Sequence, residues 1–309
     1  MTIGTGLLSS TIFDLIGKTP LVDISSLSAN PDVKILAKAE WFNPGGSIKD
    51  RAARAIVLDA EARGLLTPKK TLLDATSGNT GIAYAMIGAV RGFRVALAVP
   101  ENINPERRRI LRAHGAELIF TSSLEGSDGA IRKARQLNAE RPDIYYYADQ
   151  YNNDSNWRAH FETTGAEIWE QTGGEITHFV AGLGTTGTFV GATRFLKSKK
   201  PGLEAVAVQP DSPMHGLEGM KHMATAIVPG IYDPTLADRQ MQVATESAYR
   251  MVLQLARQEG VLAGISAGAA TVAALEVANS IRKGAIVVIF PDSGDRYLSE
   301  SFWEEHDLH

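Results

Sequence analysis

One lysine in the chain has the surroundings expected of a covalent cofactor anchor. Residues 43–51 read Asn-Pro-Gly-Gly-Ser-Ile-Lys-Asp-Arg, so Lys49 lies behind a flexible glycine pair at the predicted start of a helix. Ser47 and Asp50 match a capping box, and an apolar stripe continues the helix to Gly64. A helix N-terminus makes an ammonium less stable, which helps a lysine to lose its proton and act as a nucleophile. Most isolated lysines in such turns are only solvated, so the assignment depends on the rest of the chain.

Three glycine-bearing turns follow strand-like runs, where ligands bind in parallel sheets. Residues 76–81, Thr-Ser-Gly-Asn-Thr-Gly, offer hydroxyl, amide and backbone N–H groups that suit a carboxylate. Residues 182–188, Gly-Leu-Gly-Thr-Thr-Gly-Thr, lack the P-loop ending and the G-x-G-x-x-G spacing, so a single phosphate is the natural ligand. Residues 264–270 place Ser266 at a helix start, as a neutral partner for a heteroaromatic nitrogen. Ordinary helix caps and tight turns are the local alternatives for all three.

The elements that position these turns alternate along the chain. Short apolar strands followed by helical segments predict parallel sheets covered by helices on both faces. The expected strands are 71–74, 94–99, 117–120, 144–148, 177–181, 205–209 and 285–290, and the clearest helices are 80–91, 105–114, 129–140 and 246–259. An irregular stretch at 210–240, rich in Met, Pro and Gly, is expected to form a lid or wall. A length of 309 residues is enough for two packed lobes.

Composition excludes several classes of function. The net charge is -4 and the only dense basic run is 107–109, which favours a solvated face or an interface over a nucleic-acid site. The chain has no cysteine, which excludes disulfides and thiolate chemistry, and His215 and His222 have no regular ligand spacing, so no metal is expected. Without a signal-like N-terminus or a long apolar run, we expect a cytoplasmic protein that does not engage membranes.

A lysine, an anion-binding turn, a phosphate cup and a neutral ring partner together indicate pyridoxal phosphate. With these motifs the chain resembles fold-type II pyridoxal-phosphate enzymes of the cysteine synthase family, from Ile-Gly-Lys-Thr-Pro-Leu at 16–21 to Asp-Arg-Tyr-Leu-Ser at 295–299. The resemblance implies a tryptophan synthase β-like α/β fold, with two three-layer αβα domains, mainly parallel sheets and the active site between them. It implies a smaller N-terminal domain at 41–149 and a larger one formed by 1–40 and 150–309.

The resemblance also implies a role for each motif residue. Lys49 would anchor the cofactor and move the Cα proton, and Asn79 would lie against the 3'-oxygen of the cofactor. The residues implied in binding the substrate carboxylate are Thr76, Ser77, Gly78, Thr80 and Gln150. Those implied around the 5'-phosphate are Gly184, Thr185, Thr186, Gly187 and Thr188, with Ser266 facing the pyridine nitrogen.

Three positions refine the expected reaction. Ser266 cannot hold a ring nitrogen protonated as an aspartate would, so the ring is a weaker electron sink and β-replacement through an α-aminoacrylate is favoured. Thr186 stands where A-type cysteine synthases usually carry glycine, which resembles the B-type enzymes. Lys221 occupies a position where the B-type pattern usually has arginine. It is our candidate cation for an anionic substrate, and a solvent-facing lysine is the alternative.

The resemblance therefore implies a cysteine synthase that uses O-acetylserine or O-phosphoserine with sulfide or thiosulfate, giving cysteine or S-sulfocysteine. A cystathionine β-synthase-type core enzyme using homocysteine, a serine or threonine dehydratase, and a non-catalytic member that binds a partner's C-terminus are the alternatives. A homodimer is implied, and association with serine acetyltransferase is left open.

Overall fold

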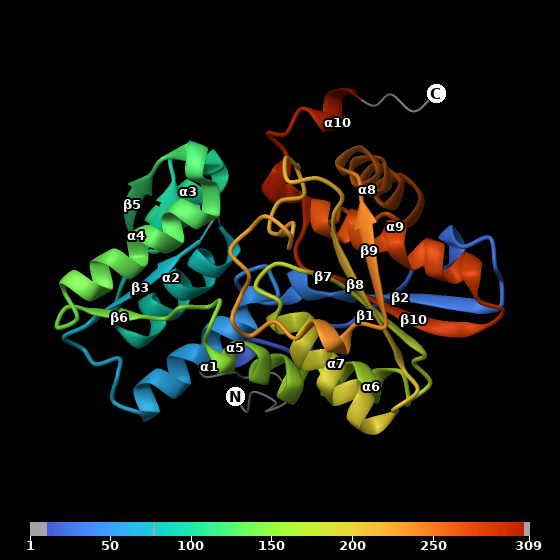
Figure 1. Ribbon diagram of the computed structural model, residues 1–309, viewed down its shortest axis with the longest axis horizontal. Helices are drawn as coiled ribbons and strands as arrows, with labels where there is room; N and C mark the ends of the chain where they lie inside the picture. The colour runs from blue at the N-terminus through green and yellow to red at the C-terminus, as the bar shows by residue number, and fades with distance from the viewer. Residues whose placement is uncertain (1–10, 77, 306–309) are drawn as a thin grey trace, which may run out of the picture.

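Two sheets organise the chain in the computed structural model, which describes residues 11–76 and 78–305 (Figure 1). The smaller sheet has four parallel strands in the order β5-β4-β3-β6. Its strands are β3 (Thr71–Ala75), β4 (Arg94–Pro100), β5 (Glu117–Thr121) and β6 (Tyr145–Tyr147).

The larger sheet has six strands in the order β1-β2-β10-β7-β8-β9. All of its neighbours pair in parallel except β1, which runs antiparallel to β2 at the edge. Its strands are β1 (Leu21–Asp23), β2 (Val33–Ala39), β7 (His178–Gly182), β8 (Glu204–Pro210), β9 (Arg239–Val243) and β10 (Gly284–Phe290).

Helices cover both faces of each sheet, because the inner strands are apolar on both sides. In the smaller sheet, Leu72 faces α1 and α2 while its neighbour Leu73 faces α4. In the larger sheet, Val288 faces α8 and α9 while Ile289 faces α6 and α7. The helices are α1 (Lys49–Ala62), α2 (Asn79–Arg91), α3 (Pro105–Ala113), α4 (Gly126–Glu140), α5 (Asp154–Ala159), α6 (Ala166–Gln171), α7 (Gly187–Lys199), α8 (Thr245–Glu259), α9 (Ile265–Ser280) and α10 (Phe302–Glu305).

Shorter helical turns connect these elements. A π-helical turn at His160–Gly165 joins α5 to α6, and its backbone packs against α7. The 3-10 turns are Ile12–Leu15, Ser25–Leu27, Glu40–Phe42, Ser123–Glu125, Pro234–Leu236 and Gly294–Tyr297.

The predicted class, an α/β chain with two three-layer units and mainly parallel sheets, is confirmed. All seven expected strands are present, with bounds that differ by one or two residues. Strands β1, β2 and β9 were not predicted, since β1 is very short and polar residues interrupt the apolar runs of β2 and β9. The expected irregular stretch is confirmed, because only one short 3-10 turn lies between β8 and β9. None of the helices in the described part of the chain is long and apolar enough to cross a membrane.

Candidate functional site

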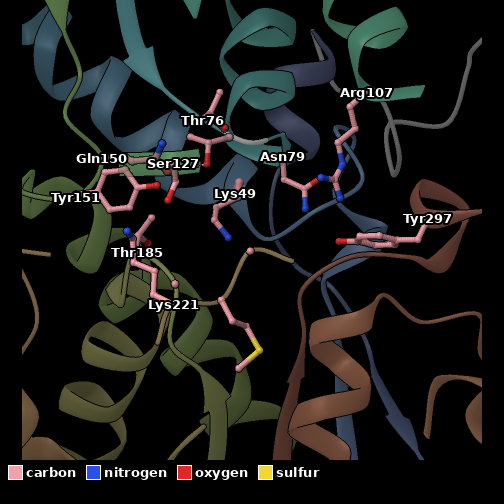
Figure 2. Close-up of a pocket in the computed structure, with 14 residues that line it drawn as sticks. Lys49, Thr76, Asn79, Arg107, Ser127, Gln150, Tyr151, Thr185, Lys221 and Tyr297 are labelled. Carbon is pink, nitrogen blue, oxygen red and sulfur yellow. Dashed lines mark hydrogen bonds between the residues drawn. The ribbon is translucent and has the colours of Figure 1, made fainter. Parts of the chain in front are cut away.

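Lys49 lines a cavity of about 80 Å³ to which the carboxyl-end turns of both sheets contribute (Figure 2). A second cavity of about 50 Å³ shares Lys49 and extends toward α7 and α9. Residues lining one or both are Thr76, Asn79, Thr80, Arg107, Ser127, Gln150, Tyr151, Gly184, Thr185, Thr186, Thr188, Glu218, Gly219, Met220, Lys221, Ser266, Asp292 and Tyr297. The three predicted turns and Lys49 therefore converge, as the sequence suggested.

Lys49 begins α1 and projects into the cavity at the centre of Figure 2. Enclosure by protein lowers the pKa of its ammonium; the carboxylate of Asp292 opposes this shift and Arg107 adds to it. A lysine that loses its proton more easily is a better nucleophile and base.

The predicted capping box in front of Lys49 is wrong. The helix starts two residues later than Ser47, with Ile48 at the N-cap position, and no side-chain cap bond forms. The hydroxyl of Ser47 accepts from the Lys49 amide at 3.2 Å, and the carboxylate of Asp50 accepts instead from the amide of Gly45. The acidic side chain therefore stabilises the glycine turn rather than the first turn of the helix.

A buried ion network fixes the start of α1. Arg51 donates to both carboxylate oxygens of Glu40 at 2.7 and 2.9 Å, and to both of Glu167 at 2.7 and 2.8 Å. Lys38, on β2, donates to the same Glu167 at 2.7 Å. Asn43, the first residue of the lysine motif, donates to Glu40 at 2.8 Å. Both ends of the motif are thus held by the same glutamate.

The turn after β3 contributes the residues predicted to bind a carboxylate. Thr76 and Thr80 are buried and line the cavity, and Gly78 forms the N-cap of α2 without lining it. Thr80 donates its hydroxyl proton to the Gln150 side-chain oxygen at 2.7 Å, and the Gln150 amide group donates to the Ala75 carbonyl at 2.7 Å. Ser77, which belongs to the same prediction, lies outside the described residues.

Asn79 is held from both sides of its amide. Its nitrogen donates to the carboxylate of Asp292 at 2.6 Å, and its oxygen accepts from Arg296. The same Asp292 oxygen accepts from the Tyr297 hydroxyl at 2.7 Å, while its other oxygen is buried without a partner in the described structure. These contacts fix which face of the Asn79 amide meets a ligand.

The turn between β7 and α7 has the geometry of an anion site. Thr186 has a φ of 69°, which is strained for a β-branched residue, and Gly187 begins α7 directly after it. The hydroxyl of Thr186 is buried and makes no hydrogen bond among the described residues. A side chain at Gly184 would overlap the carbonyl oxygen of Gly219. The turn therefore presents an unused hydroxyl and a helix N-terminus to its surroundings.

Neutral side chains support this turn from behind. Thr185 accepts from the side-chain nitrogen of Asn156 at 3.1 Å, and Thr188 lies 3.3 Å from the Nε2 atom of His160. Burial lowers the pKa of His160 well below its usual range, so its ring is neutral at physiological pH. The side chains that hold this turn in place therefore add no charge to it.

Ser266 lies in the first turn of α9 and lines the second cavity together with Asp292. Asp292 lies two residues after the end of β10, and its backbone carbonyl accepts from the amide of Gly264 at 3.0 Å. Ser266 and Asp292 thus line the same cavity, while the unpartnered Asp292 oxygen is buried next to Gly264.

Lys221 is buried, so the solvent-facing alternative is wrong. Its ammonium donates to the carboxylate of Asp128 at 3.1 Å and lies 5.1 Å from the centre of the Tyr151 ring. It lines the cavity from the segment between β8 and β9 (Figure 2). The cation is therefore at the site, already paired with a carboxylate.

Arg107 is the main cavity residue that the sequence did not reveal. The basic run at 107–109 was expected to be solvated or at an interface, which is wrong for Arg107, because it is buried and lines the cavity. It pairs with Glu218, and its guanidinium lies 4.8 Å from the centre of the Tyr297 ring. Arg109 is exposed, as expected. The helical spacing of α3, which turns one of three adjacent arginines inward, was the available signal.

These residues fit pyridoxal phosphate. The strained turn at Thr186 offers a free hydroxyl and the N-terminus of a 13-residue helix to a phosphate. Lys49 offers an amine of lowered pKa within the same pair of cavities. Ser266 and Asp292 give a polar wall for a ring nitrogen.

Comparison with known proteins agrees with this chemistry. The model of the family described as "Pyridoxal-phosphate dependent enzyme" matches residues 12–292. A cysteine synthase from Aquifex aeolicus is 49% identical over 304 residues, covering 96% of this chain and 93% of the relative. Cysteine synthase B from Escherichia coli is 42% identical over 298 residues, covering 96% and 97%.

A solved structure of a cysteine synthase (OASS) from Entamoeba histolytica superposes with a TM-score of 0.93 at 35% identity, covering 100% of this chain and 95% of that one. The predicted resemblance to the cysteine synthase family is confirmed by these matches over nearly the whole chain. The chain belongs to the family of pyridoxal-phosphate dependent enzymes.

Proposed function

We propose that this protein is an O-acetylserine sulfhydrylase, a cysteine synthase that replaces the acetate group of O-acetylserine with sulfide. A C–S bond forms at Cβ, the C–O bond to the leaving group breaks, and cysteine and acetate are released. The observation that carries the proposal is the position of Lys49 in a cavity shared by carboxylate-binding and phosphate-binding turns. The cysteine synthases among its relatives support this reaction over the alternatives.

Pyridoxal phosphate supplies the electron sink for negative charge that develops at the substrate Cα. The Nζ atom of Lys49 holds the cofactor and, as a neutral amine, takes the proton from Cα. Its lowered pKa favours the neutral form that this step needs. Burial is the main cause of the lowered pKa, the charge of Asp292 opposes it, and the charge of Arg107 adds to it.

The substrate is oriented through its α-carboxylate. The hydroxyls of Thr76 and Thr80 and the N-terminus of α2 are donors of the kind that a carboxylate needs. Thr80 is bonded to the side-chain oxygen of Gln150, so a carboxylate that takes this hydroxyl proton must also compensate Gln150 for the lost donor. A substrate held in this way would have its Cα in the cavity that Lys49 lines.

The phosphate-binding role of residues 184–188 and the ring-facing role of Ser266 belong to the same proposal. The unpartnered Thr186 hydroxyl supports the first, and the shared wall of Ser266 and Asp292 supports the second. Asn79, fixed by Asp292 and Arg296, would control the tilt of the ring through a single hydrogen bond.

Replacement of Lys49 tests the proposal. The variant Lys49→Ala should lose essentially all cysteine formation from O-acetylserine and sulfide, and should lose the spectral response of the cofactor to O-acetylserine. Lys69→Ala, which removes an exposed lysine, is the matched control. Far-ultraviolet circular dichroism confirms that both variants fold. Normal turnover by Lys49→Ala would exclude the proposed mechanism.

Substrate comparison separates the remaining candidates. The purified enzyme is assayed with sulfide, thiosulfate and homocysteine as acceptors, each with O-acetylserine and O-phosphoserine. We expect cysteine from O-acetylserine and sulfide. Efficient cystathionine formation with poor cysteine formation would instead identify a cystathionine β-synthase, and a colourless protein that binds only a peptide would identify a non-catalytic member.

We also propose that residues 41–149 form a smaller domain and that residues 1–40 and 150–309 form a larger one. The four strands of the smaller sheet all fall within the first range, and the six strands of the larger sheet all fall within the others, which supports this division. We propose a homodimer on the basis of the family relationship, and sedimentation analysis with and without a serine acetyltransferase would test both the dimer and that association.

A further inference from the structure

Lys221, a cation that lines the cavity, is joined to a carboxylate on the other side of the site. Lys221 belongs to the segment that follows β8 of the larger sheet, and Asp128 lies on α4, which covers the smaller sheet. The ammonium and the carboxylate are 3.1 Å apart. Lys221 lines the same cavity as Lys49, whereas Asp128 is not part of the lining. The carboxylate therefore acts on the cavity through Lys221.

Further contacts fix the geometry of this pair. The second oxygen of Asp128 accepts from the backbone amide of Ile227 at 3.1 Å, so the carboxylate cannot turn freely. The face of the Tyr151 ring holds the Lys221 ammonium from the other side. Burial raises the pKa of Tyr151, so its phenol stays neutral and adds no negative charge. Asp128 is thus the carboxylate that compensates the charge of Lys221.

The pairing changes what the cavity can bind. A lysine facing an enclosed cavity attracts dianions strongly when its charge is not compensated. When the charge is already compensated, a dianion must compete with a fixed carboxylate and is repelled by it. A neutral ester neither competes with this carboxylate for the lysine nor is repelled by it. O-acetylserine and O-phosphoserine are both serines with an activated hydroxyl, and the activating group is uncharged in the first and dianionic in the second.

We propose that Asp128 determines the substrate class of this enzyme, making the site select neutral activated serines over dianionic ones. The inference rests on the proposed β-replacement function and adds the residue that sets the preference for its donor. It predicts that wild-type enzyme has a higher kcat/KM with O-acetylserine than with O-phosphoserine, and that the preference depends on the charge of Asp128.

The variant Asp128→Asn tests this directly. The asparagine oxygen can still accept from the Ile227 amide, while the carboxylate charge next to Lys221 is removed. We expect the ratio of kcat/KM for O-phosphoserine to that for O-acetylserine to rise about tenfold, a size typical of altered charge pairs at partly buried sites. The double variant Asp128→Asn, Lys221→Gln should lose this gain.

A binding measurement gives an independent readout. Inorganic phosphate, used as a competitive inhibitor against O-acetylserine, should bind about tenfold more tightly to Asp128→Asn than to wild type. Glu125→Gln is the matched control, because it removes an exposed carboxylate near the start of the same helix that pairs with Arg132. This control should leave both the substrate ratio and the phosphate inhibition constant unchanged.

The outcomes separate the inference from the function on which it rests. If wild-type enzyme makes no cysteine from O-acetylserine and sulfide, the proposed function is wrong. If it does, and the substrate ratio of Asp128→Asn is unchanged or falls, the role of Asp128 is wrong. Should that variant fail to fold, Lys221→Gln serves instead. It leaves the Asp128 carboxylate without its cation, so the substrate ratio should fall about tenfold, and a rise would contradict the inference.

Discussion

Arg51 is expected to be the residue on which the position of Lys49 most depends. It lies two residues further along α1 and makes four hydrogen bonds of 2.7–2.9 Å to Glu40 and Glu167, with a fifth to Thr19 at 3.1 Å. The variant Arg51→Met removes all five and leaves the Glu40 carboxylate, which is 0% exposed, without its cation. Removing one partner of a buried ion pair costs about 3–5 kcal/mol.

The loss of stability in Arg51→Met is limited by the hydrogen bonds that Glu40 and Glu167 retain. Glu40 keeps hydrogen bonds from Thr19 at 2.6 Å and from Asn43 at 2.8 Å, and Glu167 keeps the ammonium of Lys38. These contacts still stabilise part of the negative charge that Arg51 no longer neutralises. We therefore expect the free energy of unfolding to fall by about 3 kcal/mol rather than about 5 kcal/mol. Urea denaturation at saturating pyridoxal phosphate measures it, followed by the activity of the folded fraction.

Two further variants make the reasoning refutable. Arg63→Met, at the exposed end of the same helix, removes only a surface pair with Asp59 and should cost less than about 1 kcal/mol. Adding Glu40→Gln to Arg51→Met should restore part of the stability, because the uncompensated charge is removed. Equal losses for the two arginine variants, or a larger loss in the double variant, would show that the network does not stabilise α1 as described.

Three other predictions follow from the site. Asn79→Ala should raise the dissociation constant for pyridoxal phosphate, measured by fluorescence titration. The thermal midpoint of the apoprotein should stay close to that of wild type, because only the side-chain contacts of Asn79 with Asp292, Arg296 and the cofactor are lost. Gly184→Ala should also weaken cofactor binding, since its methyl group would displace the Gly219 carbonyl; an unchanged dissociation constant would contradict the close approach. Burial alone would raise the pKa of Glu167, but hydrogen bonds from its cationic partners outweigh it and lower the pKa from 4.5 to about 2. Its stabilising effect is therefore full above pH 4.5 and lost as the pH falls toward 2, and Glu167→Gln should flatten the urea stability profile across that range.

The convergence of the three turns could be predicted from sequence because it follows from one physical rule. Parallel strands end at the same edge of a sheet, so turns that follow strands gather there whatever their separation along the chain. Thr76 follows β3, the 182–188 turn follows β7, and Lys49 follows β2 after one 3-10 turn, as this rule requires. Ser266 lines the site too, but it follows α8, so the expectation of a strand directly before residues 264–270 is wrong. The roles that we propose for them come from chemistry, because each turn combines glycines with polar groups suited to one part of the cofactor or substrate.

The pairing of charges could not be predicted in the same way. Arg107 and Lys221 each meet a carboxylate on an element that is distant in sequence, namely Glu218 and Asp128. The helical spacing of α3 indicates that one of the three adjacent arginines turns inward, but the local pattern does not identify the carboxylate that it meets. The capping-box prediction failed for a related reason, because the carboxylate of Asp50 had a competing donor in the glycine turn before it.

Both paired cations lie beside Lys49 but differ in what their partners can do. Arg107 pairs with Glu218, which itself lines a cavity, so the negative charge of that pair remains in contact with ligands. Lys221 pairs with Asp128, which lies behind it, so only the cation meets the ligand and its effective charge depends on a residue that the ligand never touches. A substitution at Asp128 can therefore change the charge of the site without changing its shape. Selectivity between neutral and dianionic donors is expected to vary at this position more readily than at any residue that contacts the substrate.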